Sequence, residues 1–334
     1  VGTNPYLASR MPHAYYAHLM KRRRVILVVC AAVVVLVIVV YVFWGSWGDW
    51  TAETVPPAPA GDGEVEIRVM SFNILSNAKW ERHVGAWEDR RDSVAACIRN
   101  FGPHLLGMQE VMPDQARDLQ RLLPKYDLVG VGRLDGKQKG EQTAIYFRRD
   151  LFEKLDEGHF WLSETPEEPG SQDWFSVVPR TVSWVRLRYR PRPEVVLYHF
   201  NTHLDPVSGY ARVQSAALLR ERIKTIADSA PIVVTGDFNT DAGKTTYRRL
   251  LGEEGEPLRL IDSYRSVHPE KDGNEGTYHV PGGLRLRRRI DWILHTEHFR
   301  AVDAGIETGK FLGRWPSDHC AVTAILRYDV GERE

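Results

Sequence analysis

Apolar and polar residues alternate in several short segments of the chain, which is the period of a half-buried β-strand. This alternation runs over residues 65–75, 181–189 and 321–328. Residues 195–202 and 232–236 are apolar almost throughout, as expected of strands that are covered on both faces. The pattern therefore predicts a core built from β-sheet.

Between the predicted strands, apolar residues recur at the spacing of one helix face. One such face contains Trp87, Val94 and Ile98, and another contains Ala216 and Ile223. Strands that alternate with amphipathic helices indicate sheets covered by helices. We therefore predict one large α/β domain.

The longest apolar run lies near the N-terminus, where residues 25–44 contain no charge, Gly or Pro. A helix of this length spans a bilayer's hydrocarbon core of about 30 Å. Basic residues at 21–24 precede the run, so the positive-inside rule predicts a transmembrane helix with its N-terminus in the cytoplasm. A cleaved signal peptide is the alternative, although its apolar region would usually be shorter.

The sequence then divides into four predicted parts. Residues 1–24 form a basic cytoplasmic tail, 25–44 the transmembrane helix and 45–64 a linker rich in Gly, Pro, Ala and Thr. Residues 65–334 form the folded domain. This organisation predicts a single-pass protein of the cell membrane whose folded domain is extracytoplasmic.

The charge balance of the folded part limits the classes of partner. From residue 65 onward there are 39 Lys plus Arg and 40 Asp plus Glu. A protein that binds by neutralising many phosphates normally has a basic excess, so nucleic acid is a possible but not a favoured partner. Only Cys97 and Cys320 lie in this part, so we expect buried thiols and no disulfide framework.

Polar side chains follow several of the predicted strands at the point where each strand ends. In α/β sheets, ligands bind beyond the carboxyl ends of the strands, so these side chains are expected to converge. A further acid lies within an apolar segment, and an Asp-His pair comes just before the last strand. The residues are Asn73, Gln109, Glu110, His203, Asp205, Asp237, Asn239, Asp291, Asp318 and His319.

Each of these residues alone has an ordinary explanation. Asn73 could cap a turn, Glu110 could stabilise a helix N-terminus, and Asp237 with Asn239 could form an Asx turn. Six separate segments that each bring such a residue to a strand end favour a functional site over these alternatives.

The residue types indicate the chemistry. Oxygen ligands such as Glu110 and Asp318 suit Mg²⁺ or Mn²⁺, whereas a Zn²⁺ site would more often use Cys or clustered His. A cation held by a few carboxylates leaves positions open for a phosphate oxygen, and a further carboxylate can orient or deprotonate a water. The pattern therefore favours metal-assisted hydrolysis of a phosphoester.

Six segments, in this order, resemble the motifs of the endonuclease/exonuclease/phosphatase superfamily of deoxyribonuclease-I-like phosphoesterases: "SFNIL", "MQEV", "NTHLD", "GDFN", "RIDWIL" and "SDHCAV". The resemblance covers about residues 65–328, and further segments resemble a bacterial branch of metal-dependent hydrolases. It implies a four-layer α/β/β/α sandwich, two packed sheets flanked by helices, with the site at one edge of the sheets.

The resemblance also implies a role for each residue of the motifs. Glu110 would be the main metal ligand, with Asn73 and Asp318 completing or supporting its shell. Asp237 would align or deprotonate the water, and Asn239 would hold a phosphate oxygen.

His319 would donate to the phosphate and be oriented by Asp291, while His203 would contact the phosphate or assist the leaving group. The remainder of the substrate would be bound by residues that resemble the bacterial branch, namely Glu141, Arg180, Arg212 and His279.

The function implied is that of a monomeric, membrane-tethered hydrolase that requires Mg²⁺ or Mn²⁺. Its substrate would be a phospholipid, a nucleotide or another organic phosphate. An extracytoplasmic nuclease is one alternative, although no basic excess supports it. A non-catalytic binding module on the same fold is the other, and the intact motif residues speak against it.

Overall fold

The computed structural model describes residues 58–61, 63–77, 84–253, 255–279 and 284–331. The predicted tail, the predicted transmembrane helix and most of the predicted linker lie outside the described residues.

The predicted membrane localisation is corrected here. Within the described ranges, no helix combines the length and the apolar character that a membrane span requires. We therefore retain neither the bilayer as a partner nor the extracytoplasmic orientation. The prediction had rested on the apolar run at 25–44, which is not part of the described residues.

The described residues form two six-stranded sheets and a small two-stranded sheet. The first sheet has the order β13-β14-β1-β2-β4-β3 and the second has the order β5-β6-β7-β8-β12-β9. The strands of the first sheet are β1 (Glu64–Asn73), β2 (Leu105–Val111), β3 (Tyr126–Val129), β4 (Gln142–Arg148), β13 (Phe299–Glu307) and β14 (Ala321–Asp329). Those of the second are β5 (Phe152–Trp161), β6 (Thr181–Tyr189), β7 (Val196–His203), β8 (Ile232–Asp237), β9 (Ile261–Asp262) and β12 (Asp291–His295). The small sheet pairs β10 (Tyr278–His279) with β11 (Arg285–Leu286).

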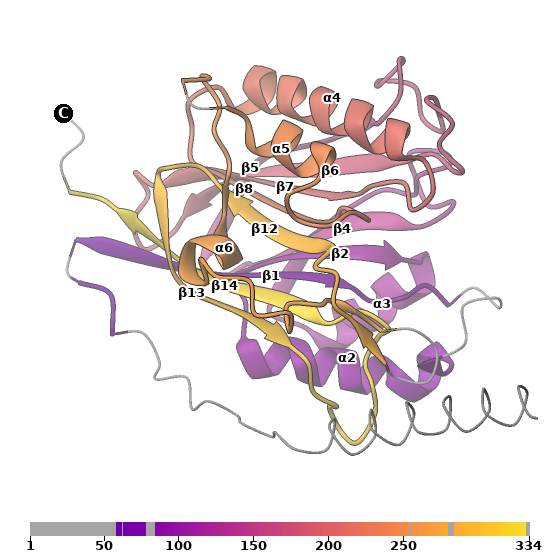
Figure 1. Ribbon diagram of the computed structural model, residues 1–334. Helices are drawn as coiled ribbons and strands as arrows, with labels where there is room; N and C mark the ends of the chain where they lie inside the picture. Colours follow the sequence, from indigo (N-terminus) through magenta and orange to yellow (C-terminus); the bar gives the residue numbers. More distant parts are fainter. Residues whose placement is uncertain (1–57, 62, 78–83, 254, 280–283, 332–334) are drawn as a thin grey trace, which may run out of the picture. The chain divides into compact units, whose positions relative to one another are not determined.

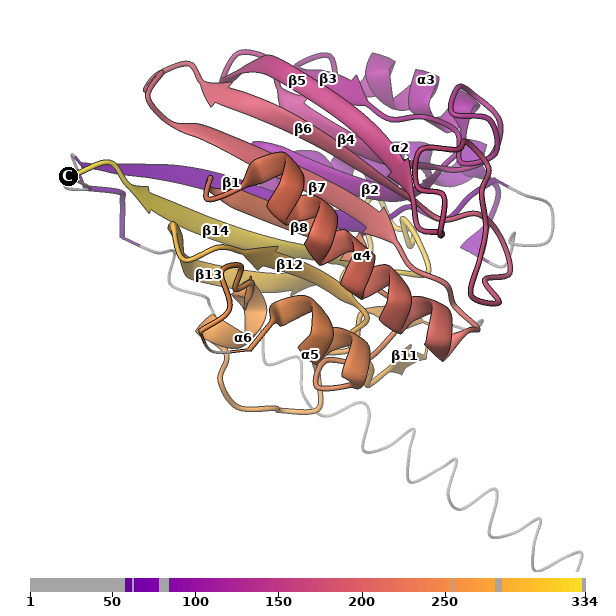
Figure 2. The same ribbon diagram turned by 90° about the horizontal axis from the view of Figure 1, so that it is seen from above.

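Helices cover the outer faces of the two large sheets (Figure 1). The first sheet packs against α2 (Trp87–Phe101) and α3 (Pro113–Leu122). The second packs against α4 (Gly209–Ala227) and α5 (Thr245–Leu251), which lie over its strands in Figure 2. A short helix, α6 (Ser263–Val267), follows β9.

Three apolar clusters hold these layers together. The cluster between the sheets includes Ile67 and Leu105 from the first sheet and Leu197 and Val233 from the second. The other two lie between each sheet and its helices. This arrangement confirms the predicted α/β sandwich and follows from the sequence pattern, because strands with apolar residues on both sides can be covered on both faces.

The register of the central strands brings their ends together. β1 and β2 are parallel, with Asn73 opposite Gln109. β7 and β8 are also parallel, with His203 opposite Asp237. β12 runs antiparallel to β8 and places Asp291 opposite Asp237. The polar residues at these strand ends therefore meet at one edge of the sandwich.

Gly107 of β2 sits where the two sheets approach each other closely. A Cβ atom added to Gly107 would collide with the Thr235 hydroxyl and would lie 2.6 Å from Oδ1 of Asn201. Asn201 Oδ1 accepts hydrogen bonds from Gln109 Nε2 at 2.7 Å and from Thr235 Oγ1 at 3.0 Å. Near the site, the sheets are thus joined by buried polar side chains, and a glycine makes room for them.

We expect Gly107→Ala to lower the free energy of unfolding by about 1–3 kcal/mol, because overpacking forces side chains and backbone apart. Urea unfolding of the purified protein measures this. Gly309→Ala is the matched control, since nothing lies within 4 Å of a Cβ there. Equal effects of the two substitutions would show that the sheet contact at Gly107 is not tight.

Candidate active site

The strand ends surround a cavity of about 580 Å³. Its walls come from both sheets and from the loops that follow or precede their strands. Most of the residues predicted from the sequence line it, namely Glu110, Glu141, Arg180, His203, Arg212, Asp237, Asn239, Asp318 and His319.

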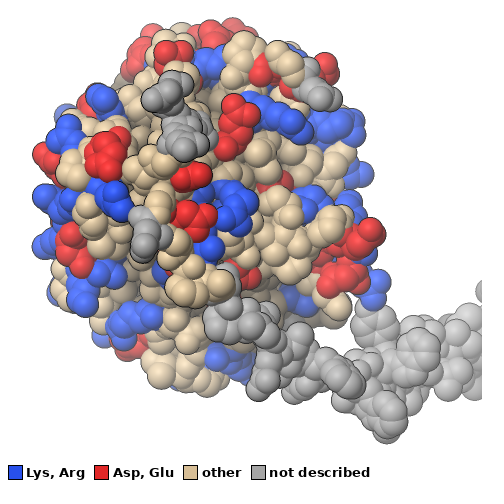
Figure 3. Space-filling model, turned by 90° about the vertical axis from the view of Figure 1, so that its left-hand side faces the viewer, with Lys and Arg blue, Asp and Glu red and all other residues tan. Residues whose placement is uncertain are grey.

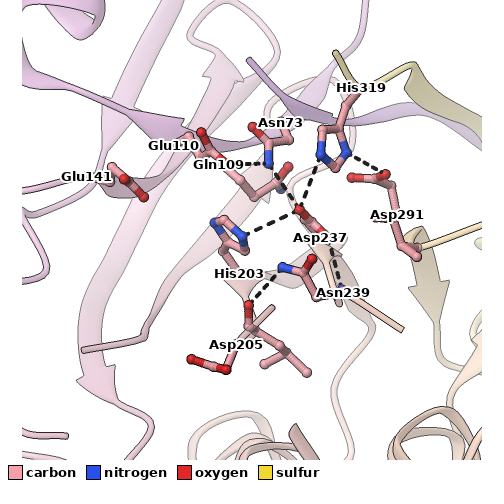
Figure 4. A network of polar contacts seen from close by, with 12 residues as sticks. Asn73, Gln109, Glu110, Glu141, His203, Asp205, Asp237, Asn239, Asp291 and His319 are labelled. Atoms are coloured by element: carbon pink, nitrogen blue, oxygen red, sulfur yellow. Dashed lines mark hydrogen bonds and ion pairs between the residues drawn. The ribbon is translucent and has the colours of Figure 1, made fainter. Parts of the chain in front are cut away.

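Asp237 is the centre of the contacts drawn in Figure 4. Its Oδ2 atom accepts a hydrogen bond of 3.0 Å from Asn73 Nδ2. His203 Nε2 lies 3.4 Å and His319 Nε2 lies 3.7 Å from the same oxygen. The Oδ1 atom accepts from the backbone N–H of Asn239 at 3.0 Å. One buried carboxylate therefore contacts residues from both sheets.

The surroundings of Asp237 make it a stronger base than an ordinary aspartate. Burial is the main cause, the nearby Asp291 carboxylate adds to it, and together they raise the pKa of Asp237 to about 7. The hydrogen bonds from Asn73 and Asn239 and the nearby His319 act in the opposite direction. A carboxyl with such a pKa can accept a proton at neutral pH.

Asp291 holds the imidazole of His319. Its Oδ2 atom lies 2.9 Å from His319 Nδ1, and both side chains are buried. Burial lowers the pKa of His319, but Asp291, Asp237 and Asp318 outweigh burial and raise this pKa well above the ordinary value. His319 is therefore held protonated, with its Nε2 atom directed at Asp237.

His203 has the opposite protonation behaviour. Burial is the main cause that lowers its pKa well below the ordinary value, and Arg180, Arg133 and His319 add to this effect. His203 is thus a neutral imidazole in the cavity wall. The two histidines that face Asp237 differ because only His319 has a second carboxylate bound to it.

Glu110 is positioned by a distortion of β2. The pairing of β2 with β4 shifts register between Met108 and Val111, and Glu110 adopts a φ of 60°. Its two carboxylate oxygens accept hydrogen bonds of 3.0 Å from Asn73 Nδ2 and from the Ser76 backbone N–H. A left-handed conformation is costly for a residue other than Gly, and such strain clusters at functional sites.

Asn73 connects the two acids on either side of it. Its Nδ2 atom donates to Glu110 and to Asp237, and its Oδ1 atom accepts from the Leu75 backbone N–H at 3.0 Å. Both polar atoms of Asn73 are therefore engaged with protein groups, so Asn73 holds the Glu110 carboxylate in place. Its part in a metal shell stays a prediction.

The donor set fits a hard divalent cation. Glu110, Asp237 and Asp318 all line the cavity, and close carboxylates repel one another unless a cation lies between them. Asp237, Asp291 and His319 offer ligand atoms within 4.8 Å of one another and could also hold a metal ion. Oxygen-rich sites of this kind suit Mg²⁺ or Mn²⁺.

Arg180 lies in the cavity wall without a hydrogen-bond partner for its buried Nε and Nη1 atoms. Only 6% of its surface is exposed. The neighbouring acid, Glu141, already binds Arg133 through two hydrogen bonds of 2.6 and 3.0 Å. A buried guanidinium with two N–H groups that lack acceptors is costly, so Arg180 is suited to an anionic ligand.

Asp205 and Arg212 support the loop beyond β7. The Asp205 carboxylate is directed away from Asp237 (Figure 4), and Arg212 Nη1 donates to the Asp205 carbonyl at 2.7 Å. Asn239 Nδ2 donates to the Leu204 carbonyl at 3.0 Å. Gln109 is buried between the sheets and does not line the cavity.

A scan against protein-family models matches residues 70–319 to the endonuclease/exonuclease/phosphatase family. The chain belongs to the endonuclease/exonuclease/phosphatase family. Nucleases and phosphatases hydrolyse phosphoesters, so the family places the chain among the phosphoester hydrolases. The family also generally depends on divalent metals, which agrees with the donor set of the cavity.

Among solved structures, the mannosyl-6-phosphatase of Bacteroides thetaiotaomicron is 32% identical, with a TM-score of 0.71 and coverage of 78% of this chain and 99% of that one. Nocturnin of Xenopus laevis is 23% identical over 79% of this chain and 73% of its own length. A probable RNA exonuclease of Schizosaccharomyces pombe is 26% identical over 56% of this chain and only 39% of its own length.

His279 is the one predicted substrate residue that the structure does not bring to the cavity. Its ring packs 4.8 Å from that of Trp315 and lies against Cys320, and it is not among the lining residues. The preceding Tyr278 lines the cavity instead, with its ring 5.1 Å from that of His319. Neighbouring strand residues point to opposite faces, which explains this difference.

The sequence reasoning also missed two arginines that line the cavity, Arg133 and Arg288. Arg133 pairs with Glu141, eight residues later, and Arg288 pairs with Asp241 at 3.1 Å. Neither lies at the end of a predicted strand, so the sequence carried no signal for them.

We expect Glu110→Gly to be more stable than Glu110→Ala by about 1 kcal/mol, because Gly adopts a positive φ without steric cost. Both variants lose the carboxylate, so the difference between their free energies of unfolding reports the cost of the left-handed backbone conformation. Urea unfolding provides the measurement. At the exposed Glu221 within α4 the order should be reversed by about 1 kcal/mol, since Gly destabilises a helix interior. If the Gly variant is the more stable one, or the less stable one, at both positions, the backbone at Glu110 is not strained.

Proposed function

We propose that the protein is a divalent-metal-dependent phosphoester hydrolase and that its preferred substrates are phosphomonoesters of small organic molecules. The buried Asp237, which contacts Asn73, His203 and His319, is the observation that carries this proposal. We assign the activity to the predicted domain at 65–334.

In this proposal Asp237 orients the attacking water and takes its proton. The raised pKa of this carboxyl supports the role, because a general base works best when its pKa lies near the ambient pH. The backbone N–H of Asn239 donates a hydrogen bond to the Asp237 carboxylate. The side-chain amide of Asn239 would bind a phosphate oxygen.

His319 and Asp291 act as a pair. The hydrogen bond that Nδ1–H of His319 donates to Asp291 fixes the ring and favours the imidazolium, so Nε2–H can donate to the phosphate as its negative charge grows. The neutral His203 would contact the phosphate or the leaving oxygen.

Glu110 and Asp318, with Asn73 holding Glu110 in place, are the residues proposed to hold the cation. A bound Mg²⁺ or Mn²⁺ would supply positive charge that polarises the phosphate. Arg180 and Arg212 would bind further phosphate oxygens from the opposite wall, and Glu141 would keep Arg133 in position.

The choice of a small phosphomonoester rests on two observations. The solved mannosyl-6-phosphatase shares 32% identity over nearly its whole length, and the cavity of about 580 Å³ has the size of a small-molecule site. A nuclease is the second candidate, since one relative is a probable RNA exonuclease. The charge balance disfavours it, because basic and acidic side chains are interspersed on the face seen in Figure 3.

We expect the purified protein to release phosphate from phosphomonoesters with Mg²⁺ or Mn²⁺ and to lose this activity in EDTA. Asp237→Ala and His319→Ala should each reduce kcat by about 10²-fold or more, because each removes a base or a charge-stabilising donor. A panel of sugar phosphates, nucleotides and single-stranded RNA, assayed for phosphate release and chain cleavage, provides the measurement.

The exposed Asp156 supplies the control, and Asp156→Ala should keep full activity. Cleavage of RNA with no turnover of phosphomonoesters would favour the nuclease. If no phosphoester is hydrolysed under any metal condition, the non-catalytic binding module becomes the better interpretation.

Arg180→Gln should raise KM about tenfold or more, because a hydrogen bond to a charged group contributes about 1.5–3 kcal/mol. The free energy of unfolding of the ligand-free variant should stay equal or rise, since a buried guanidinium with two N–H groups lacking acceptors is removed. Arg186→Gln, at an exposed position of β6, should change neither quantity. Lower stability with an unchanged KM would assign Arg180 a structural role.

A further inference from the structure

Exposed apolar side chains gather beside the cavity. Seven large apolar residues are exposed among the described residues, and four of them lie in two neighbouring segments, the loop before β6 and the segment that leads from β7 into the first turn of α4. These four, Phe175, Val177, Val207 and Tyr210, are here named the apolar shelf. Phe175 is 87% exposed, and its ring centroid lies 6.4 Å from that of Tyr210.

The apolar shelf is continuous with the cavity wall. Val177 itself lines the cavity, as do Val178 and Pro206, which adjoin shelf residues in the chain. Arg212, which also lines the cavity, lies two residues after Tyr210 in the sequence. The apolar shelf is therefore next to the cavity, within reach of an organic group that extends from a phosphate bound there.

Asp205 clamps the two segments of the apolar shelf to each other. Its Oδ2 atom accepts from the Ser176 hydroxyl at 2.9 Å and from the Val177 backbone N–H at 2.8 Å. Its Oδ1 atom accepts from the backbone N–H groups of Val207 and Ser208 at 2.9 and 2.6 Å. The apolar shelf is therefore held in place before any ligand binds.

The backbone at the apolar shelf is strained. Trp174 and Phe175 have φ values of 59° and 62°, although neither is Gly. The Trp174 carbonyl accepts a hydrogen bond of 3.0 Å from the Ser208 hydroxyl, which fixes this conformation. Trp174 packs against the core while Phe175 projects into solvent. Single exposed apolar residues are common, but a strained and clamped cluster at a cavity mouth points to ligand binding.

We propose that the apolar shelf binds a flat aromatic ring in the organic group of the substrate, as in a nucleoside or aryl phosphate. This inference rests on the proposed function, because the phosphate of the same molecule would occupy the cavity. It adds a subsite that distinguishes aromatic phosphoesters from sugar phosphates.

The chemistry of the shelf favours a ring over a sugar. Phe175, Val177 and Val207 have no polar side-chain atoms, and the polar groups between the two segments bond to one another through Asp205. A sugar needs partners for its hydroxyl groups, whereas an aromatic ring gains from stacking on Phe and Tyr.

The test compares adenosine 5′-monophosphate with ribose 5-phosphate, which differ only in the base. Calorimetry with Mg²⁺, on protein that carries Asp237→Ala so that neither ligand is hydrolysed, should show the nucleotide binding about tenfold more tightly, as expected from stacking. Phe175→Ala and Tyr210→Ala should each remove most of this advantage and leave binding of ribose 5-phosphate unchanged. Leu312→Ala, another highly exposed position, is the control and should preserve the advantage.

Turnover separates the two proposals and the two ring types. If both variants lose kcat/KM for p-nitrophenyl phosphate as well as for the nucleotide, the apolar shelf binds any flat ring. If they lose it for the nucleotide alone, the shelf binds a nucleobase. The inference is overturned if the nucleotide has no binding advantage, or if both variants keep it. Binding as expected without turnover of any phosphoester would contradict the proposed function and leave the subsite standing.

Discussion

The hydrogen bond between Asn73 Nδ2 and Asp237 Oδ2 joins the two sheets at the point where the site lies. Asn73 is the last residue of β1 in the first sheet, and Asp237 is the last residue of β8 in the second. A small shift of one sheet over the other would separate them. Farther along the strands, the apolar cluster between the sheets and the polar contacts around Gly107 prevent such a shift. The geometry of the site is thus a property of the whole sandwich.

The site concentrates unfavourable features that the rest of the fold must offset. Asp237 and Asp291 are buried next to each other, which opposes the ionisation of Asp237. Glu110 has a left-handed backbone, and Arg180 is buried without a hydrogen-bond partner for two of its nitrogens. Three apolar clusters supply the stability that tolerates these costs. The same features prepare charges and a proton acceptor for a reacting phosphate, which explains why they occur together.

The apolar pattern of the central strands predicted sheets covered by helices, and the resemblance of the strand-end motifs to a known superfamily implied the sandwich. Parallel strands bring their carboxyl ends to one edge, so Asn73 and Asp237 could be expected to meet although 164 positions separate them. Short strands carry no such pattern. In the two-residue β10, the sequence favoured His279, whereas Tyr278 lines the cavity, because a single step along a strand reverses the side chain.

Loops were the least predictable part, and they are where recognition of the substrate would lie. Asp205 resembles a motif residue in the sequence, yet its carboxylate binds four groups of two loops and faces away from Asp237. Only the folded chain reveals that this acid holds Phe175 at the cavity mouth. Strand ends fix the positions of the reacting groups, while loops can change without disturbing the sheets. A relative that shares the strands can therefore share the chemistry and still differ in the organic group that it accepts.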